Sequence, residues 1–331
     1  MEDSKKSLDL NKGFTSILEL RPYIDILITQ LQSGIPGRGN ESEEDFKIGV
    51  AYLECAKRDI AASKLLYKKK DYPNSIYHLQ QATEKIVKGY FKLQTLLNQP
   101  QIRQVGHKTP MAYLQLLKSY WLKNYLLELK PLIHGVDFSP LDNIIVTKNN
   151  LNSNSTRLEL AKLNSESIEK LILVIDSISP AKEELSFESI LKQKGITLDE
   201  VETQIWELAK SLDSSVERDD SKPLKMEINQ FYRKLRISLY VFVSLYTLAL
   251  ITFPHEEFTR YPDREIKPSQ YTENLGVVSE FNALMDRVEG IYKYIESELI
   301  RESSRCGNSN IILLRRIATF LKYGQSGKSK C

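Results

Sequence analysis

Two pairs of histidine and arginine have residue types and spacings that could support chemistry. His255 and Arg260 lie in the segment "PHEEFTRYP", and Arg103 and His107 lie in "QIRQVGHKTP". An imidazole can take up and return a proton near neutral pH, and a guanidinium can stabilise negative charge that develops on a phosphate. Either pair is therefore a candidate for acid–base chemistry on a phosphodiester, and His255 with Arg260 is the stronger candidate.

Each pair also has a structural explanation. His255 follows the most apolar segment of the chain, so "PHEEFTRYP" is expected at one end of a helical bundle. At that position Arg260 could simply pair with Glu256 or Glu257 in a loop. The other pair lies in a predicted loop, where such residues are more commonly part of the surface. Both interpretations stay open at the level of sequence.

A set of basic residues lies on the predicted helix "YHLQQATEKIVKGY", residues 77–90, and its continuation. At 100° per residue, apolar side chains from Ile76 to Leu93 share one face. The opposite face carries His78, Gln81, Lys85, Lys88 and Lys92. These groups could contact a phosphate backbone in a salt-dependent way, or they could form a solvated basic face.

The C-terminal segment "IILLRRIATFLKYG" is a second basic element, and it contributes Arg315 and Arg316. Its cations could contact the same phosphates. Its apolar side could instead lie on a membrane surface, enter a partner's groove or dock on its own bundle. The sequence does not rank these alternatives.

Composition limits the classes of function. The 331 residues are 41% hydrophobic with a net charge of +3, which is mildly basic and does not by itself predict nucleic-acid binding. The three cysteines and four histidines have no spacing typical of a disulfide framework or a metal site, so neither a metal nor a cofactor is expected. The N-terminus lacks a secretory signal, and a cytoplasmic location is predicted.

The periodicity of the chain is helical, and the predicted class is all-α. The uncharged run at 237–254 has the length of a membrane span, but its hydroxyl groups favour a buried core helix, and no membrane partner is expected. Residues 135–156 are predicted to be a polar loop. Helices are predicted at 14–33, 43–70, 73–93, 110–132, 157–178, 198–212, 223–254 and 275–303, with a short basic helix near 311–324. Thr197 and Glu200 form a predicted capping box for the helix at 198–212.

The stretch from Ala56 to Leu117 resembles the HEPN domain, a helical family associated with nucleotides and RNA. The residues that carry the resemblance are Ala56, Asp59, Ala62, Leu65, Tyr72, Ser75, Gln81, Ala82, Glu84, Lys85, Lys88 and His107. The resemblance implies a bundle of four or more helices, a homodimer with a cleft, and in catalytic members a metal-independent ribonuclease with an R-x(4–6)-H motif. No arginine of this chain has a histidine five to seven positions downstream, so that motif is missing.

These observations predict a HEPN-like helical bundle with additional helices. The predicted parts are 1–40, an N-terminal helix and hinge; 43–135, the hairpin core; 136–222, an inserted helical region; 223–303, the apolar and closing helices; and 304–331, a basic extension. The resemblance implies binding of RNA or a nucleotide in a stress, defence or toxin–antitoxin context. Its enzymatic form is a metal-independent endoribonuclease, and the alternative is a non-catalytic helical module, as a dimer, that holds a partner protein.

Overall fold

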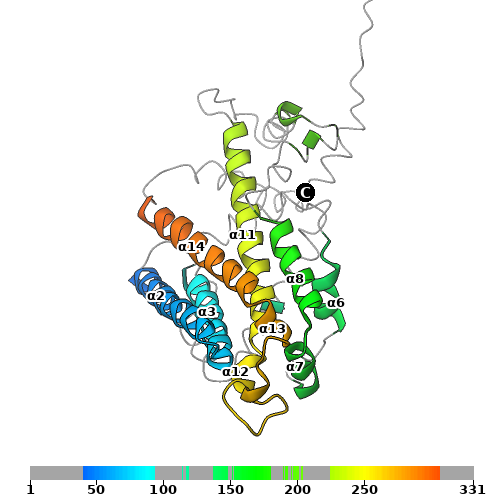
Figure 1. Cartoon of the computed structure of the whole chain (residues 1–331). Helices are drawn as coiled ribbons and strands as arrows, with labels where there is room; N and C mark the ends of the chain where they lie inside the picture. The colour runs from blue at the N-terminus through cyan, green and yellow to red at the C-terminus, as the bar shows by residue number, and fades with distance from the viewer. Residues whose placement is uncertain are drawn as a thin grey trace, which may run out of the picture. The chain divides into compact units, whose positions relative to one another are not determined.

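The computed structural model describes residues 40–93, 137–147, 153–179 and 224–305, together with isolated positions between them. These residues form ten helices joined by turns, and no strand occurs among them (Figure 1). The all-α class predicted from the sequence is therefore confirmed for the described part of the chain.

The chain divides into two compact units. One unit comprises residues 36–186 and 231–306, and the other comprises 1–35, 187–230 and 307–331. Nearly all described residues belong to the first unit. The five-part division predicted from the sequence is not decided by this partition and stays a prediction.

Helices α2 (Asn40–Lys68) and α3 (Tyr72–Leu93) form the predicted antiparallel hairpin. The turn between them is a Schellman motif, in which Asp71 N donates to Leu66 O at 3.0 Å and Lys70 N donates to Tyr67 O at 2.9 Å. Lys70 takes the left-handed position of this motif, with φ 62°. Pro73 lies in the first turn of α3, where its missing N–H leaves no helical bond unmade.

Small side chains allow the two helices of the hairpin to approach closely. Ser63 Oγ donates to Ser75 O at 2.7 Å, and Ser75 Oγ donates to Ser63 O at 2.9 Å. At the other end, a Cβ on Gly89 would lie 3.1 Å from Gly49 O. These reciprocal hydrogen bonds satisfy both buried hydroxyl groups where the two helices meet.

The region after the hairpin corrects two predictions. The predicted polar loop at 135–156 contains α6 (Ser139–Thr147) and the first turn of α7 (Asn154–Ala161). The predicted helix at 157–178 is divided between α7 and α8 (Ser165–Ser177). Polar residues cap the starts of both helices. Ser153 Oγ accepts from Thr156 N at 3.1 Å at the start of α7, and Asn164 Oδ1 accepts from Ser167 N at 2.9 Å at the start of α8.

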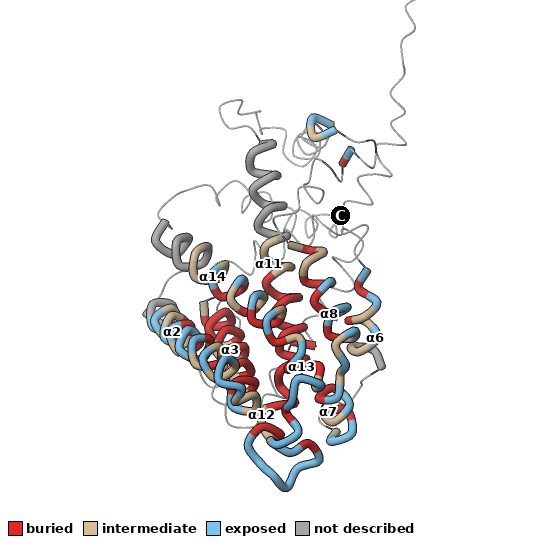
Figure 2. Tube along the Cα trace, in the orientation of Figure 1, coloured by how far each residue is buried: buried red, intermediate tan, exposed pale blue. Residues whose placement is uncertain are grey.

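The apolar run belongs to α11 (Leu224–Thr252), and residues 241–255 are all buried (Figure 2). The predicted core helix is thus confirmed. No helix among the described residues is long and apolar enough to cross a membrane. The chain then forms the short helix α12 (His255–Phe258), an exposed loop that contains η4 (Pro268–Gln270), α13 (Gly276–Ser279) and α14 (Phe281–Arg305).

Helix α14 joins the hairpin to α8. The ring of Tyr67 stacks on Phe281 with centroids 4.0 Å apart, and the Tyr67 hydroxyl donates to Val278 O at 3.1 Å. On the other side, Arg287 donates two bonds to the Asp176 carboxylate, at 2.6 and 2.7 Å. These contacts fix the hairpin, α13 and α8 in one bundle.

Several predicted elements lie wholly or mostly outside the described residues. They are the helices at 14–33 and 311–324, and most of those at 110–132 and 198–212. The capping box that opens the last of these is confirmed: Glu200 N donates to Thr197 Oγ1 at 3.2 Å, and Thr197 N donates to Glu200 Oε2 at 2.7 Å.

Candidate functional site

A stripe of half-buried polar residues runs along α3. We call the set of Tyr77, His78, Gln81, Glu84, Lys85 and Lys88 the α3 stripe. The inner face of the helix is buried, as predicted, from Ile76 to Tyr90. Because α3 contacts α2 on one side and α12 on another, the α3 stripe lies between these two elements.

On the α2 side, the stripe is organised by Asp59. Asp59 Oδ1 lies 2.9 Å from His78 Nδ1, and Asp59 Oδ2 accepts a hydrogen bond from the Lys85 ammonium. The carboxylate therefore offsets the positive charge of Lys85 and is already bonded to His78, which are two of the predicted phosphate contacts. It also orients the imidazole, whose side chain is 32% exposed.

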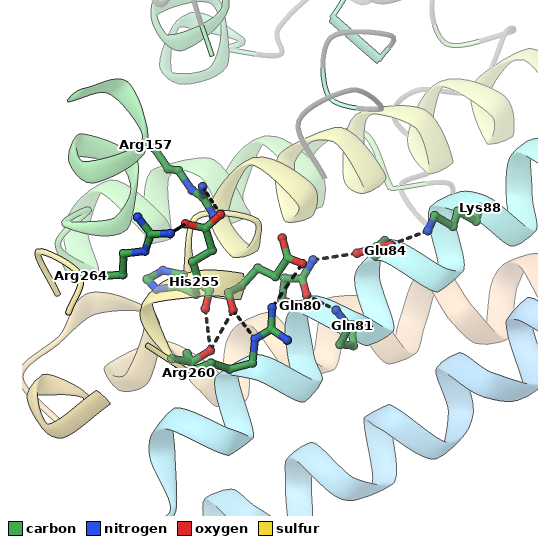
Figure 3. Close-up of polar contacts among 11 residues, drawn as sticks. Gln80, Gln81, Glu84, Lys88, Arg157, His255, Arg260 and Arg264 are labelled. Atoms are coloured by element: carbon green, nitrogen blue, oxygen red, sulfur yellow. Dashed lines mark hydrogen bonds and ion pairs between the residues drawn. The ribbon is translucent and has the colours of Figure 1, made fainter. Parts of the chain in front are cut away.

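On the α12 side, the stripe is organised by Glu84. Its carboxylate accepts from Lys88 Nζ at 2.5 Å and from Gln80 Nε2 at 3.1 Å, and Gln81 Nε2 donates to Gln80 Oε1 at 2.7 Å (Figure 3). Gln80 is fully buried, so this chain of bonds connects the core to Lys88, of whose side chain 12% is accessible. Lys88, like Lys85, is thus a predicted phosphate contact that already pairs with an acidic side chain.

Lys92 corrects the prediction of a uniformly solvated basic face. Its side chain is fully buried, and its ammonium donates to Asp45 Oδ1 at 2.5 Å. Asp45 lies near the start of α2, so the antiparallel hairpin brings it against the last turn of α3. A contact between Lys92 and a phosphate stays a prediction, but this ammonium is already enclosed with a counter-charge.

An arginine cluster surrounds α12. We use this name for three arginines, Arg157 of α7 with Arg260 and Arg264 (Figure 3), together with Glu256 and Glu257, with which they pair. Glu257 lies 2.9 Å from Arg157 Nη1 and 3.3 Å from Arg264 Nη2. Arg260 Nε donates to Glu256 O at 3.1 Å, while its Nη2 lies 3.7 Å from Glu256 Oε1. The cluster therefore contains three guanidinium groups and two carboxylates.

Burial and charge perturb the arginine cluster. Burial raises the pKa of the Glu256 carboxyl, the negative charge of Glu84 adds to this shift, and the charges of Arg260 and Arg157 oppose it. Arg157 Nε is buried and lacks an acceptor within the described part of the chain. A buried guanidinium donor without a partner is unusual, and an anion is a natural acceptor for it.

His255 occupies a different environment from Arg260. The imidazole is 1% exposed, and its Nδ1 shares a hydrogen bond of 2.7 Å with the Tyr271 hydroxyl. Burial, with a smaller contribution from the positive charge of Arg157, lowers the pKa of His255 to about 3. Arg260 is half-exposed at the surface, so the two side chains have separate partners.

Four other predicted site residues lie outside the described residues: Arg103, His107, Arg315 and Arg316. Among the residues that the structure does describe, no group of three or more histidine, cysteine, aspartate or glutamate side chains is arranged to hold a metal ion.

Sequence reasoning anticipated the pairing of Arg260 with Glu256 but missed Arg157 and Arg264. Arg264 belongs to the same loop, and its charge was a local signal. Arg157 lies about a hundred residues away on a helix that was predicted to be partly loop, so no local signal pointed to it.

Comparison with known proteins gives one match: residues 50–151 match the sequence profile of the HEPN domain family. This range includes most of α2, all of α3 and α6. No curated protein matches the chain, and no solved structure matches it. The arginine cluster contacts α3 but lies beyond the matched residues.

Proposed function

We propose, from the premise that the chain contains a HEPN domain at residues 50–151, that this protein binds RNA or a nucleotide in a stress, defence or toxin–antitoxin context. The observation that carries the proposal is the arginine cluster beside the α3 stripe. A guanidinium presents five N–H donors in a planar fork that matches phosphate oxygens. Three such groups meet only two carboxylates, those of Glu256 and Glu257, in these ion pairs.

The arginine side chains of the cluster differ in solvent exposure, so that a polyanion could contact some at the surface and others deeper in the site. Arg264 is the most exposed member, with 45% of its side chain accessible, and Arg157 is the least, with 12%. Arg264 would meet a phosphate first, and Arg157 would supply its buried Nε, which has no acceptor among the residues that the structure describes. The cluster would thus position a phosphate without reading sequence.

The enzymatic form of the proposal is a divergent metal-independent endoribonuclease. Its candidate residues remain His255 with Arg260, and Arg103 with His107. For His255, RNA would have to reach a buried imidazole, and a pKa of about 3 makes that imidazole a weak base at neutral pH. The binding form of the proposal is therefore better supported than catalysis by His255.

A second candidate function is a non-catalytic helical module that holds a partner protein, as a homodimer. It is favoured by the acids that already pair with the basic residues of α3: Asp59 with Lys85, Glu84 with Lys88, and Asp45 with Lys92. A helix whose cations are satisfied internally needs no phosphate to neutralise them.

Gel mobility of labelled single-stranded and structured RNA in EDTA, over a series of salt concentrations, tests the proposal. The Arg264→Gln variant should bind more weakly and lose about one unit of the log–log salt slope. Arg58→Gln is the matched control, because it removes the same charge from an exposed position on α2. Failure of the wild type to bind RNA or nucleotide would overturn the proposal and favour the partner-holding module. RNA fragments with 2′,3′-cyclic phosphate ends would show that the protein is also a metal-independent ribonuclease.

A further inference from the structure

The side chain of Arg260 contacts two aromatic rings. Its Cζ lies 5.1 Å from the ring centroid of Tyr77 on α3 and 5.2 Å from that of Tyr261. Its Nε is fixed by the bond to Glu256 O. Arg260 is therefore held in place by the backbone of α12 and by a ring of the α3 stripe, and it does not swing freely from the loop.

Tyr261 is exposed beside this arginine. It is 44% accessible, one of the large hydrophobic residues that stand out on the described surface. It lies in the exposed run 260–265, and that run is followed by the buried side chains of Ile266 and Tyr271. The ring of Tyr261 therefore presents an aromatic surface to solvent beside a guanidinium group that is held in place.

Such planar groups favour one class of ligand. Nucleobases stack on tyrosine rings and on guanidinium planes, and the energy of stacking is largely independent of base identity because each base has a π-face. Arg260 also attracts electron-rich rings through its charge. A phosphate attached to the stacked nucleoside would meet further cations of the arginine cluster. Arg264, for example, lies three residues after Tyr261 in the same loop.

We infer that Tyr261 and Arg260 form a stacking site for a nucleobase, either of single-stranded RNA or of a free nucleotide. Tyr77 contacts Arg260 through its ring and is a positioning residue. The inference rests on the proposed function and makes it specific, since it selects single-stranded over duplex RNA. In a duplex the bases are already stacked on each other and present no face to Tyr261.

The test compares four probes on the full-length protein by fluorescence anisotropy or competition: a short single-stranded RNA, an abasic ribose-phosphate oligomer of equal length, the corresponding duplex and AMP. The abasic oligomer carries the phosphates without bases. Single-stranded RNA should bind about tenfold or more tightly than the abasic oligomer, the range expected for one stacked base. Competition by AMP would identify a free nucleotide as a source of the base.

Variants of Tyr261 separate stacking from folding. Tyr261→Ala should lower the affinity for single-stranded RNA to that of the abasic oligomer, and Tyr261→Phe should preserve it because the ring remains. Leu173→Ala, which also truncates an exposed apolar side chain, is the control and should change neither affinity. Equal binding of RNA and abasic oligomer, or an unchanged affinity in Tyr261→Ala, would overturn the inference while leaving phosphate binding intact. Absence of binding by every probe would overturn both.

Discussion

The imidazole of His255 and the phenol of Tyr271 share a hydrogen bond of 2.7 Å inside the bundle, with ring centroids 5.6 Å apart. Burial raises the pKa of the Tyr271 hydroxyl, so the phenol stays protonated. Burial also lowers the pKa of His255, so the imidazole stays neutral. This neutral pair ties α12 to the residue that follows η4 and so anchors both ends of the exposed loop.

The first prediction concerns the pH dependence of stability. The pKa of His255 is about 3 in the folded protein, against 6.5 for an ordinary histidine. Between these values the unfolded chain binds a proton that the folded chain does not, so stability falls as the pH is lowered from about 6.5 toward 3. The expected slope from this group is about 1.4 kcal/mol per pH unit. Urea denaturation at several pH values measures it.

The control for that experiment is His255→Gln, which keeps a polar partner for Tyr271 but does not titrate. Its stability should change less steeply with pH than that of the wild type between pH 5 and 6.5. Only the difference in slope is interpreted, so a constant loss of stability in the variant does not affect the result. Equal slopes would show that His255 is accessible to protons in the folded state.

The second prediction concerns Gly276 at the start of α13. A Cβ at this position would lie 2.2 Å from Leu163 O and 2.8 Å from Asn164 C, both backbone atoms of the turn between α7 and α8. Backbone cannot move aside as a flexible side chain can, so Gly276→Ala should destabilise the protein by about 1–3 kcal/mol or more. Thermal unfolding checks it. Gly290→Ala on α14 is the control, because its Cβ would meet nothing within 4 Å.

Local signals were sufficient to predict the hairpin. Helical periodicity located the buried face of α3, and the predicted start of this helix at residue 73 lies one position from the observed start at Tyr72. The uncharged run of α11 was correctly placed in the core because its hydroxyl groups argued against a membrane span. The caps were the weak point: Ser153 was predicted to lie in a loop and Asn164 in the interior of a helix, although each one caps the start of a helix.

The charge pairs that define the candidate site depend on contacts between distant segments. Periodicity placed Lys92 on the outer face of α3, and only the tertiary contact with Asp45 explains why it is buried. Likewise, the ring of Tyr77 could not be linked to Arg260 from the sequence, since 183 positions separate them. The sequence indicated the pairing of Arg260 with a neighbouring glutamate, but it revealed neither Arg264 of the same loop nor the partners contributed by other helices.

The third prediction concerns Lys70, which has a φ of 62° at the end of α2. A side chain in the left-handed region costs about 1–2 kcal/mol, whereas glycine adopts this conformation without strain. Lys70→Gly should therefore raise the free energy of unfolding, by about 0.5–1 kcal/mol after the extra entropy of glycine in the unfolded chain is included. Lys69→Gly, one position earlier, is the control and should lower the free energy of unfolding or leave it unchanged. A loss of stability in Lys70→Gly would contradict the assigned turn.

The last prediction concerns the buried pair of Lys92 and Asp45. The Lys92 side chain is fully enclosed, while 23% of the Asp45 side chain is accessible. Removing the carboxylate would leave an ammonium in the core without a counter-charge, and such changes cost about 3–5 kcal/mol. Asp45→Asn should therefore destabilise the protein more than Lys92→Met, which leaves a carboxylate that can still reach water. The double variant should recover part of the loss of Asp45→Asn, because it no longer contains a buried charge. Chemical denaturation of the three variants gives the comparison, and a double variant no more stable than Asp45→Asn would show that the methionine does not fit the space of the lysine.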